Sequence, residues 1–222
     1  PSNLIELKEG CLNNTQYLTN IYVSPNNPFY SKYEDKFIIK KSSIENENFD
    51  VLVFCLHHVE NVTIPSFIKH IGMFCFSGCD QLKTVNFLDD SQLEIIDISA
   101  FSDSSIEEFD IPSNVIEIKQ ECFSNTYNLT SIKVSPKNKQ FICFDEKMII
   151  RKSSCESENY DVLVFCNRNV EEITIPSFVT IIGSTTFYRN SSIQKVEFLN
   201  DSQLQIIEDD AFRYSTIEFF SI

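Results

Sequence analysis

The sequence lacks tryptophan, has only four glycines, and is short of positive charge, with 18 Lys and Arg against 32 Asp and Glu. The formal net charge of −14 makes nucleic acid an unexpected partner, because an acidic surface repels phosphate backbones. No apolar run approaches the roughly 18 residues of a membrane span. We therefore expect no nucleic-acid binding and no membrane contact by this segment.

Phenylalanine is in excess, with 20 residues, and a tandem repeat accounts for it. The tripeptide Pro-Ser-Asn at residue 1 returns at residue 112, and the match continues without a gap, giving repeats 1–111 and 112–222. The run Asp-Val-Leu-Val-Phe-Cys at 50–55, for example, returns at 161–166. Self-similarity at a fixed period is the signature of a repeat architecture.

A shorter period lies inside each repeat. A Pro-Ser dipeptide opens four segments, and a bulky apolar residue lies eleven places after each proline: Leu12, Phe76, Phe123 and Phe187. Two variant segments carry Ala-Phe at 100–101 and 211–212. Each coil is thus 23 to 24 residues long and ends in alternating aliphatic residues, such as Val85 and Phe87. Alternation at period two predicts a strand with its aliphatic side chains inward, and stacked coils then bury a continuous core.

The pattern Ile-Pro-Ser-x-Val-x-x-Ile-Gly-x-x-(Ala/Cys)-Phe-x-x-Cys-x-x-Leu, best matched by 64–87, resembles the BspA-like (treponemal-type) leucine-rich repeats. The stretch 135–150, followed by 161–166, is similar to the longer coil of that family, which carries a β-hairpin. The resemblance implies an α/β repeat solenoid of right-handed coils. It further implies a parallel β-sheet face, short helical turns and one β-hairpin insertion per 111-residue repeat. Members of the family occur in bacteria and parasitic protists, where many are described as surface antigens or adhesins.

The histidines His57, His58 and His70 are the first candidates for catalysis, and the second repeat serves as a control. None of the three recurs there; Ile181, for instance, matches His70. His70 with Cys75 and Cys79 fits no common zinc spacing. The sequence also has no Gly-rich phosphate loop and no G-x-S-x-G elbow. We therefore predict a non-enzymatic protein with no metal and no cofactor.

The eight cysteines could form a disulfide framework, but a simpler interpretation is available. Cys75 and Cys122 occupy the small-residue site that holds Ala100 in another coil. Free cysteine behaves as a small buried apolar side chain, so we favour reduced thiols in the core. Cys143 and Cys155 lie in the predicted hairpin region, and whether they pair is left open.

A partner would contact the outward residues of the parallel sheet. Eight strands at ~4.8 Å spacing would make a sheet about 40 Å long, enough for the ~800 Å² per partner of an ordinary interface. The outward positions are Asn20, Tyr22, Thr63, Thr84, Asn86, Glu108, Asp110, Ser131, Lys133, Glu172, Thr174, Lys195, Glu197 and Phe219. We predict these as the partner-binding face.

The expected function is a protein-binding repeat domain of a cell-surface or secreted antigen or adhesin, with a protein or host-surface ligand. The alternative is a cytoplasmic protein-interaction scaffold, which reduced thiols would favour. We expect 1–222 to be a single solenoid domain and a fragment of a longer array. The reason is that Ile222 matches Ile111, which leads directly into another Pro-Ser-Asn copy.

Overall fold

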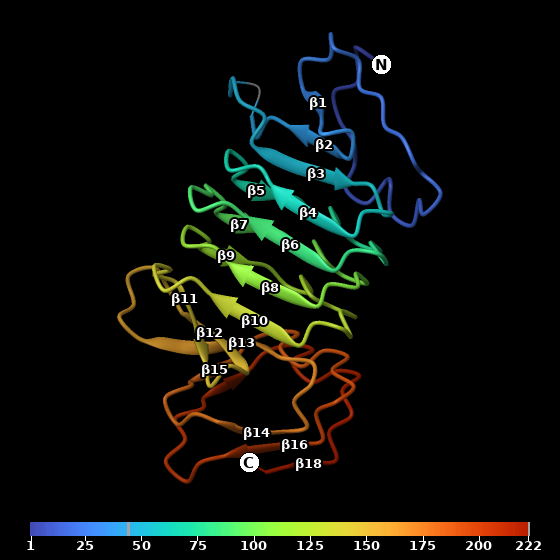
Figure 1. Cartoon of the computed structure of the whole chain (residues 1–222). Helices are drawn as coiled ribbons and strands as arrows, with labels where there is room; N and C mark the ends of the chain where they lie inside the picture. Colours follow the sequence, from blue (N-terminus) through green and yellow to red (C-terminus); the bar gives the residue numbers. More distant parts are fainter. Residues whose placement is uncertain (44, 222) are drawn as a thin grey trace. The chain divides into compact units, whose positions relative to one another are not determined.

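The computed structural model describes residues 1–43 and 45–221, which form two compact units of β-structure (Figure 1). Unit 1 consists of residues 1–106 and Glu117–Phe123, and unit 2 of Glu107–Ile116 and residues 124–221. The division lies near the repeat boundary but does not coincide with it. Around the junction of the two repeats, Glu107–Ile116 belong to unit 2 and Glu117–Phe123 belong to unit 1.

Unit 1 begins with an antiparallel hairpin and continues as parallel coils. Its strands are β1 (Tyr30–Tyr33), β2 (Phe37–Lys40), β3 (Val51–Cys55), β4 (Asn61–Ile64), β5 (His70–Ile71), β6 (Thr84–Phe87), β7 (Ile95–Ile96) and β9 (Glu117–Ile118). Strands β1, β2 and β3 are antiparallel, and β3 then pairs in parallel with β5, followed by β7 and β9. On the other side of the coils, β4 pairs in parallel with β6.

Unit 2 has the same plan. Its strands are β8 (Glu108–Ile111), β10 (Ser131–Val134), β11 (Phe141–Phe144), β12 (Met148–Lys152), β13 (Tyr160–Cys166), β14 (Glu172–Ile175), β15 (Ile181–Ile182), β16 (Lys195–Phe198), β17 (Ile206–Ile207) and β18 (Phe219–Phe220). The hairpin β11–β12–β13 leads into parallel β15 and β17. Two further parallel sets are β8–β10 and β14–β16–β18. The predicted parallel sheet face and the hairpin insertion in each repeat are confirmed.

The predicted short helical turns, and with them the α/β class, are wrong: none of residues 1–43 and 45–221 lies in a helix, and the fold is a β-solenoid. The turn around each core phenylalanine contains two residues with left-handed backbone, such as Phe74 at φ 60° and Gly78 at φ 71°. Its amides reach the next coil, since the Phe76 N–H donates to the Ala100 carbonyl at 2.7 Å and the Gly78 N–H donates to Ser102 at 2.9 Å. An α-helix would direct these N–H groups to its own chain four residues back. The described chain accordingly offers no helix that could cross a membrane.

The core of each unit is built around stacked phenylalanine rings, as the repeat predicts. In unit 1, the rings of Phe76 and Phe101 lie 4.9 Å apart and nearly parallel, and Phe123 continues the stack at 5.8 Å. In unit 2, Phe187 and Phe212 stack at 4.8 Å. These distances lie within the range of favourable aromatic pairs, so one recurring sequence position supplies a spine to each core.

Candidate binding face and groove

The long strands of the coils alternate between buried and exposed side chains. In β14, for example, Ile173 and Ile175 are buried while Glu172 and Thr174 are exposed. Ten of the predicted face residues are exposed: Asn20, Tyr22, Thr63, Asn86, Glu108, Asp110, Lys133, Glu172, Thr174 and Phe219. Thr84, Ser131, Lys195 and Glu197 are partly exposed. Every predicted position thus reaches the surface, as the period-two pattern requires.

The prediction of one unbroken sheet of eight such strands is wrong in two places. Residues 20–23, which carry Asn20 and Tyr22, form no strand in the described structure. Strands β10 and β14 belong to separate sheets. The reason is the hairpin, whose strands β11–β13 lie between β10 and β14 in the view of Figure 1. An insertion between two coils interrupts the strand-to-strand spacing that a continuous sheet needs.

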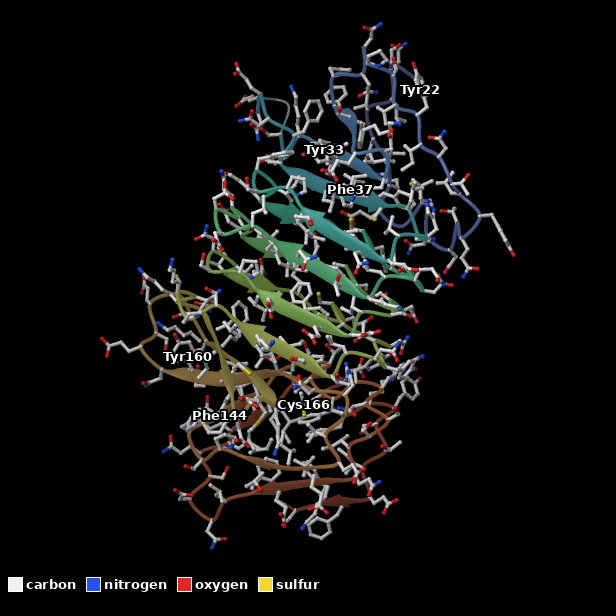
Figure 2. The ribbon with its side chains drawn as sticks, viewed as in Figure 1. Tyr22, Tyr33, Phe37, Phe144, Tyr160 and Cys166 are labelled. Atoms are coloured by element: carbon white, nitrogen blue, oxygen red, sulfur yellow. The ribbon has the colours of Figure 1, made fainter. Side chains whose placement is uncertain are left out.

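A groove of about 910 Å³ occupies the interruption between β10 and β14 in unit 2. Its walls are residues 130–134 and 169–172, and the turn between β11 and β12 contributes Asp145, Glu146 and Lys147. The two walls meet at one end, because the N–H of Arg168, just before one wall, donates to the carbonyl of Leu129, just before the other, at 3.2 Å. Phe144 and Cys166, which are labelled in Figure 2, belong to the hairpin strands of this region.

Asn167 fixes the hairpin turn against the groove. Its N–H donates to the Lys147 carbonyl at 2.9 Å, and its Nδ2 donates to the Glu146 carbonyl at 2.7 Å. The Asn167 side chain is almost completely buried, and within the described residues its Oδ1 has no hydrogen-bond partner. Asn167 therefore holds the turn that lines the groove through two hydrogen bonds, one from its backbone and one from its side chain.

The groove carries an excess of negative charge. Four carboxylates line it, from Asp145, Glu146, Glu171 and Glu172, against the two ammonium groups of Lys133 and Lys147. Lys147 Nζ lies 3.5 Å from Asp145 Oδ2, so part of its charge is already compensated. The period-two pattern predicts that Lys133 and Glu172 lie on the face, and the structure adds the turn between β11 and β12 beside them.

Residues 43–162 and 148–222 match the model of the BspA type leucine-rich repeat region, in six copies. The chain belongs to the BspA-type leucine-rich repeat family. Its coil pattern and tandem organisation are those of that family, as the sequence resemblance implied. No curated protein matches the sequence.

Two solved structures are similar to this family member. The pneumococcal vaccine antigen PcpA is 25% identical with a TM-score of 0.65, and the match covers 74% of this chain and 40% of PcpA. A leucine-rich cell surface protein from Faecalibacterium prausnitzii is 23% identical with a TM-score of 0.55, covering 68% of this chain and 41% of that protein. The second likeness shows the fold alone. The chain spans less than half the length of either structure.

The three histidines of this BspA-type protein lie in unit 1. His57 is buried, and His58 is exposed. His70 Nε2 lies 2.9 Å from Asp97 Oδ2, and Lys119 Nζ lies 3.1 Å from Asp97 Oδ1. Burial raises the pKa of Asp97, but hydrogen bonds from the Ile98 N–H and from Lys119 outweigh burial and hold that pKa below its usual range.

His70 and Asp97 line a second cavity, of about 220 Å³, together with Lys40, Cys11 and Phe54. Sequence reasoning missed Asp97 and Lys119, because their meeting with His70 depends on the register between successive coils. The parallel pairing of β5 with β7 places His70 opposite Ile95, two residues before Asp97. A coil-by-coil alignment of the short strands would have brought these residues together.

The cysteines next to His70 in sequence are core residues. Cys75 and Cys79 are buried, and burial raises the pKa of the Cys75 thiol well above its usual value. Zinc binds thiolate rather than thiol, so such a site opposes metal binding. Across the part of the chain that the structure describes, no three His, Cys, Asp or Glu side chains gather as metal ligands would. All eight cysteines are free thiols, including the exposed Cys155 and the half-buried Cys143.

Proposed function

We propose that this chain is the partner-binding part of a non-enzymatic cell-surface protein, and that it contacts a protein ligand through the outward side chains of its long strands. The observation that carries the proposal is the row of exposed polar residues on β14 and partly exposed ones on β16, next to the 910 Å³ groove that Glu172 of β14 lines. Leucine-rich repeat proteins generally mediate protein interactions, which agrees with this use of the face.

The surface location is supported by the relatives. PcpA is described as a vaccine antigen, and the Faecalibacterium prausnitzii protein is described as a cell surface protein. Antibodies against this chain should therefore stain intact cells of the source organism without permeabilisation. Staining that requires permeabilisation would contradict a surface role.

The binding face can be tested by photo-cross-linking. A photoreactive amino acid at Thr174, on β14, should cross-link to a protein of the host surface layer. The same amino acid at Gln205, which is exposed next to the short strand β17, serves as the control and should not. Equal cross-linking from both positions would show that the long strands have no special role.

A cytoplasmic scaffold is the second candidate, and the five buried free cysteines favour it. Disulfides form and persist mainly in oxidising compartments, so a fully reduced set agrees with a cytoplasmic location. Thiol titration of native protein isolated from the source cells separates the two candidates. Oxidation of the exposed Cys11 and Cys155 in that material would favour the cell surface.

A further inference from the structure

Strands β10 and β14 are both terminal strands of their sheets, and they flank the same groove. β10 pairs with β8 and is the last strand of its sheet, while β14 pairs with β16 and is the first strand of its own. One groove wall is β10 with Thr130, and the other is residues 169–172, which end at the first residue of β14. Terminal strands present rows of backbone donors and acceptors that can pair with another chain.

The pairing on the far sides of β10 and β14 determines which backbone groups turn to the groove. The Lys195 N–H donates to the Glu171 carbonyl at 3.1 Å, and the Ser135 N–H donates to the Ile111 carbonyl at 2.9 Å. In a parallel ladder, alternate residues direct their N–H and C=O groups to opposite sides. The backbone groups on the unpaired sides are therefore those of Ile132 and Val134 in β10 and of Glu172 and Thr174 in β14, and all of these residues except Thr174 line the groove. Cys143 Sγ donates to the Ile132 carbonyl at 3.4 Å, which agrees with this direction and leaves the second lone pair of that carbonyl for a peptide.

We propose that the groove receives an extended, lysine- or arginine-rich peptide segment of the protein partner, which pairs as an added strand with β10 and β14. This inference rests on the proposed function and names the kind of partner. Addition of a strand to a sheet edge is a general mode of peptide recognition, in which backbone bonds give affinity and alternate side chains give selectivity. Each wall strand is four residues long, which corresponds to roughly 13 Å of extended peptide.

Charge selects a basic segment as the occupant. Asp145, Glu146, Glu171 and Glu172 line the groove against Lys133 and Lys147, and the sequence as a whole has a net charge of −14. An acidic peptide, or a second copy of this chain, would meet repulsion there.

The experiment uses a labelled seven-residue peptide of alternating lysine with valine or threonine, added to the whole chain. We expect saturable binding, with slower amide hydrogen exchange at Ile132, Val134, Glu172 and Thr174. A peptide with N-methyl groups on alternate residues keeps its charge but lacks backbone donors, and it should bind at least tenfold more weakly. The same peptide with glutamate in place of lysine should not bind measurably.

Two matched double variants test the charge argument. Glu171→Lys with Glu172→Lys alters the groove, while Asp89→Lys with Asp90→Lys makes the same change of charge at an exposed turn outside both the groove and the predicted face. The first pair should weaken peptide binding at least tenfold, and the second pair should weaken it less than threefold. Circular dichroism of both variants checks that the fold is retained.

The outcomes separate this inference from the proposed function. Equal weakening by both double variants, or equal binding of the N-methylated peptide, would overturn strand addition in the groove. Exchange protection on β16 and β18 instead would also overturn it, while leaving the face as the binding surface. Failure of the cross-linking at Thr174 together with absent peptide binding would overturn both.

Discussion

At the scale of single residues, His57 and Arg168 show how the two repeats solve the same packing problem with different chemistry. The residues hold matching positions, and both are buried beside a phenylalanine ring. The ring centroids of His57 and Phe54 are 5.6 Å apart, and the Arg168 guanidinium carbon lies 4.9 Å from the ring centroid of Phe165. Burial lowers the pKa of Arg168 to about 10, so it remains charged at neutral pH. Burial also lowers the pKa of His57, which favours the neutral imidazole.

The depressed pKa of His57 predicts a loss of stability on mild acidification. Since the unfolded imidazole titrates near 6.5, the unfolded chain binds the proton more readily than the folded chain. The free energy of unfolding should therefore decrease as the pH falls from 6.5 through the lower folded pKa. Urea unfolding across this range measures the effect, and His57→Gln should reduce the slope while His58→Gln, at an exposed site, should not. An unchanged slope in His57→Gln would refute the assignment.

Asn167 provides the second prediction at this scale, because Leu56 stands at the matching position of the first repeat and is fully compatible with burial there. Asn167→Leu removes the unpaired Oδ1 and loses the bond to the Glu146 carbonyl. An unsatisfied buried group costs about 1–3 kcal/mol and a typical hydrogen bond contributes about 1, so we expect stabilisation by roughly 1 kcal/mol. Chemical denaturation checks this result. Asn167→Ala, which leaves a cavity, should show no gain, and destabilisation by the leucine variant would contradict the account.

At the scale of elements, the hairpins of the two repeats close with the same three-residue turn, 34–36 and 145–147, whose first two residues have left-handed backbone. Asp145 and Glu146 have φ of 52° and 54°, and Glu34 and Asp35 have φ of 49° and 57°. Positive φ at both central residues is the type I′ geometry, which glycine and asparagine adopt most easily. Neither glycine nor asparagine is present at these turns, so the local sequence does not predict the type I′ geometry.

Glu146→Gly should stabilise unit 2, because it relieves a left-handed conformation that is costly for glutamate. The expected gain is about 1 kcal/mol, since strained backbone costs of order 1–3 kcal/mol and glycine loses more entropy on folding. Differential scanning calorimetry would detect the rise in melting temperature. Glu146→Ala serves as the control, because alanine meets the same backbone restriction, and an equal gain from alanine would point to charge instead.

The same elements show where sequence reasoning succeeds and where it stops. Alternation identified the long strands and their outward residues, because burial of every second side chain is imposed on any coil that stacks. The short helical turns came from the family resemblance, and they are absent because two left-handed residues shape each turn; around Phe76 these are Phe74 and Gly78, and only the second is a glycine that the sequence could reveal. The groove was missed because it depends on how far the hairpin separates β10 from β14, a spacing that no local pattern encodes.

At the scale of the whole molecule, the two compact units and the two repeats divide the chain differently. Residues 107–116 belong to unit 2 and residues 117–123 belong to unit 1, although the repeat boundary lies at 111–112. That residues 1–222 make one continuous solenoid stays a prediction. What the family membership establishes is the coil pattern that both units use.

The net charge of −14 predicts a salt effect that belongs to the molecule as a whole. Self-repulsion among carboxylates disfavours the compact state, and screening reduces it as the Debye length shortens from about 30 Å at 0.01 M to 3 Å at 1 M. The thermal midpoint should therefore rise with sodium chloride over roughly this range. Sodium chloride and potassium chloride should act alike at equal ionic strength, and a falling midpoint would show that exposed ion pairs outweigh repulsion.

The parallel pairing of β8 with β10 has a consequence for how the number of repeats can change in evolution. It is made of the end of one repeat and the start of the next, paired residue by residue from Glu108–Ser131 to Ile111–Val134. Unequal recombination between copies that removes or adds a whole 111-residue repeat recreates such a pairing from the same sequence positions. Copy number can then change without disturbing the buried residues, and the outward side chains, which do not pack in the core, are free to vary.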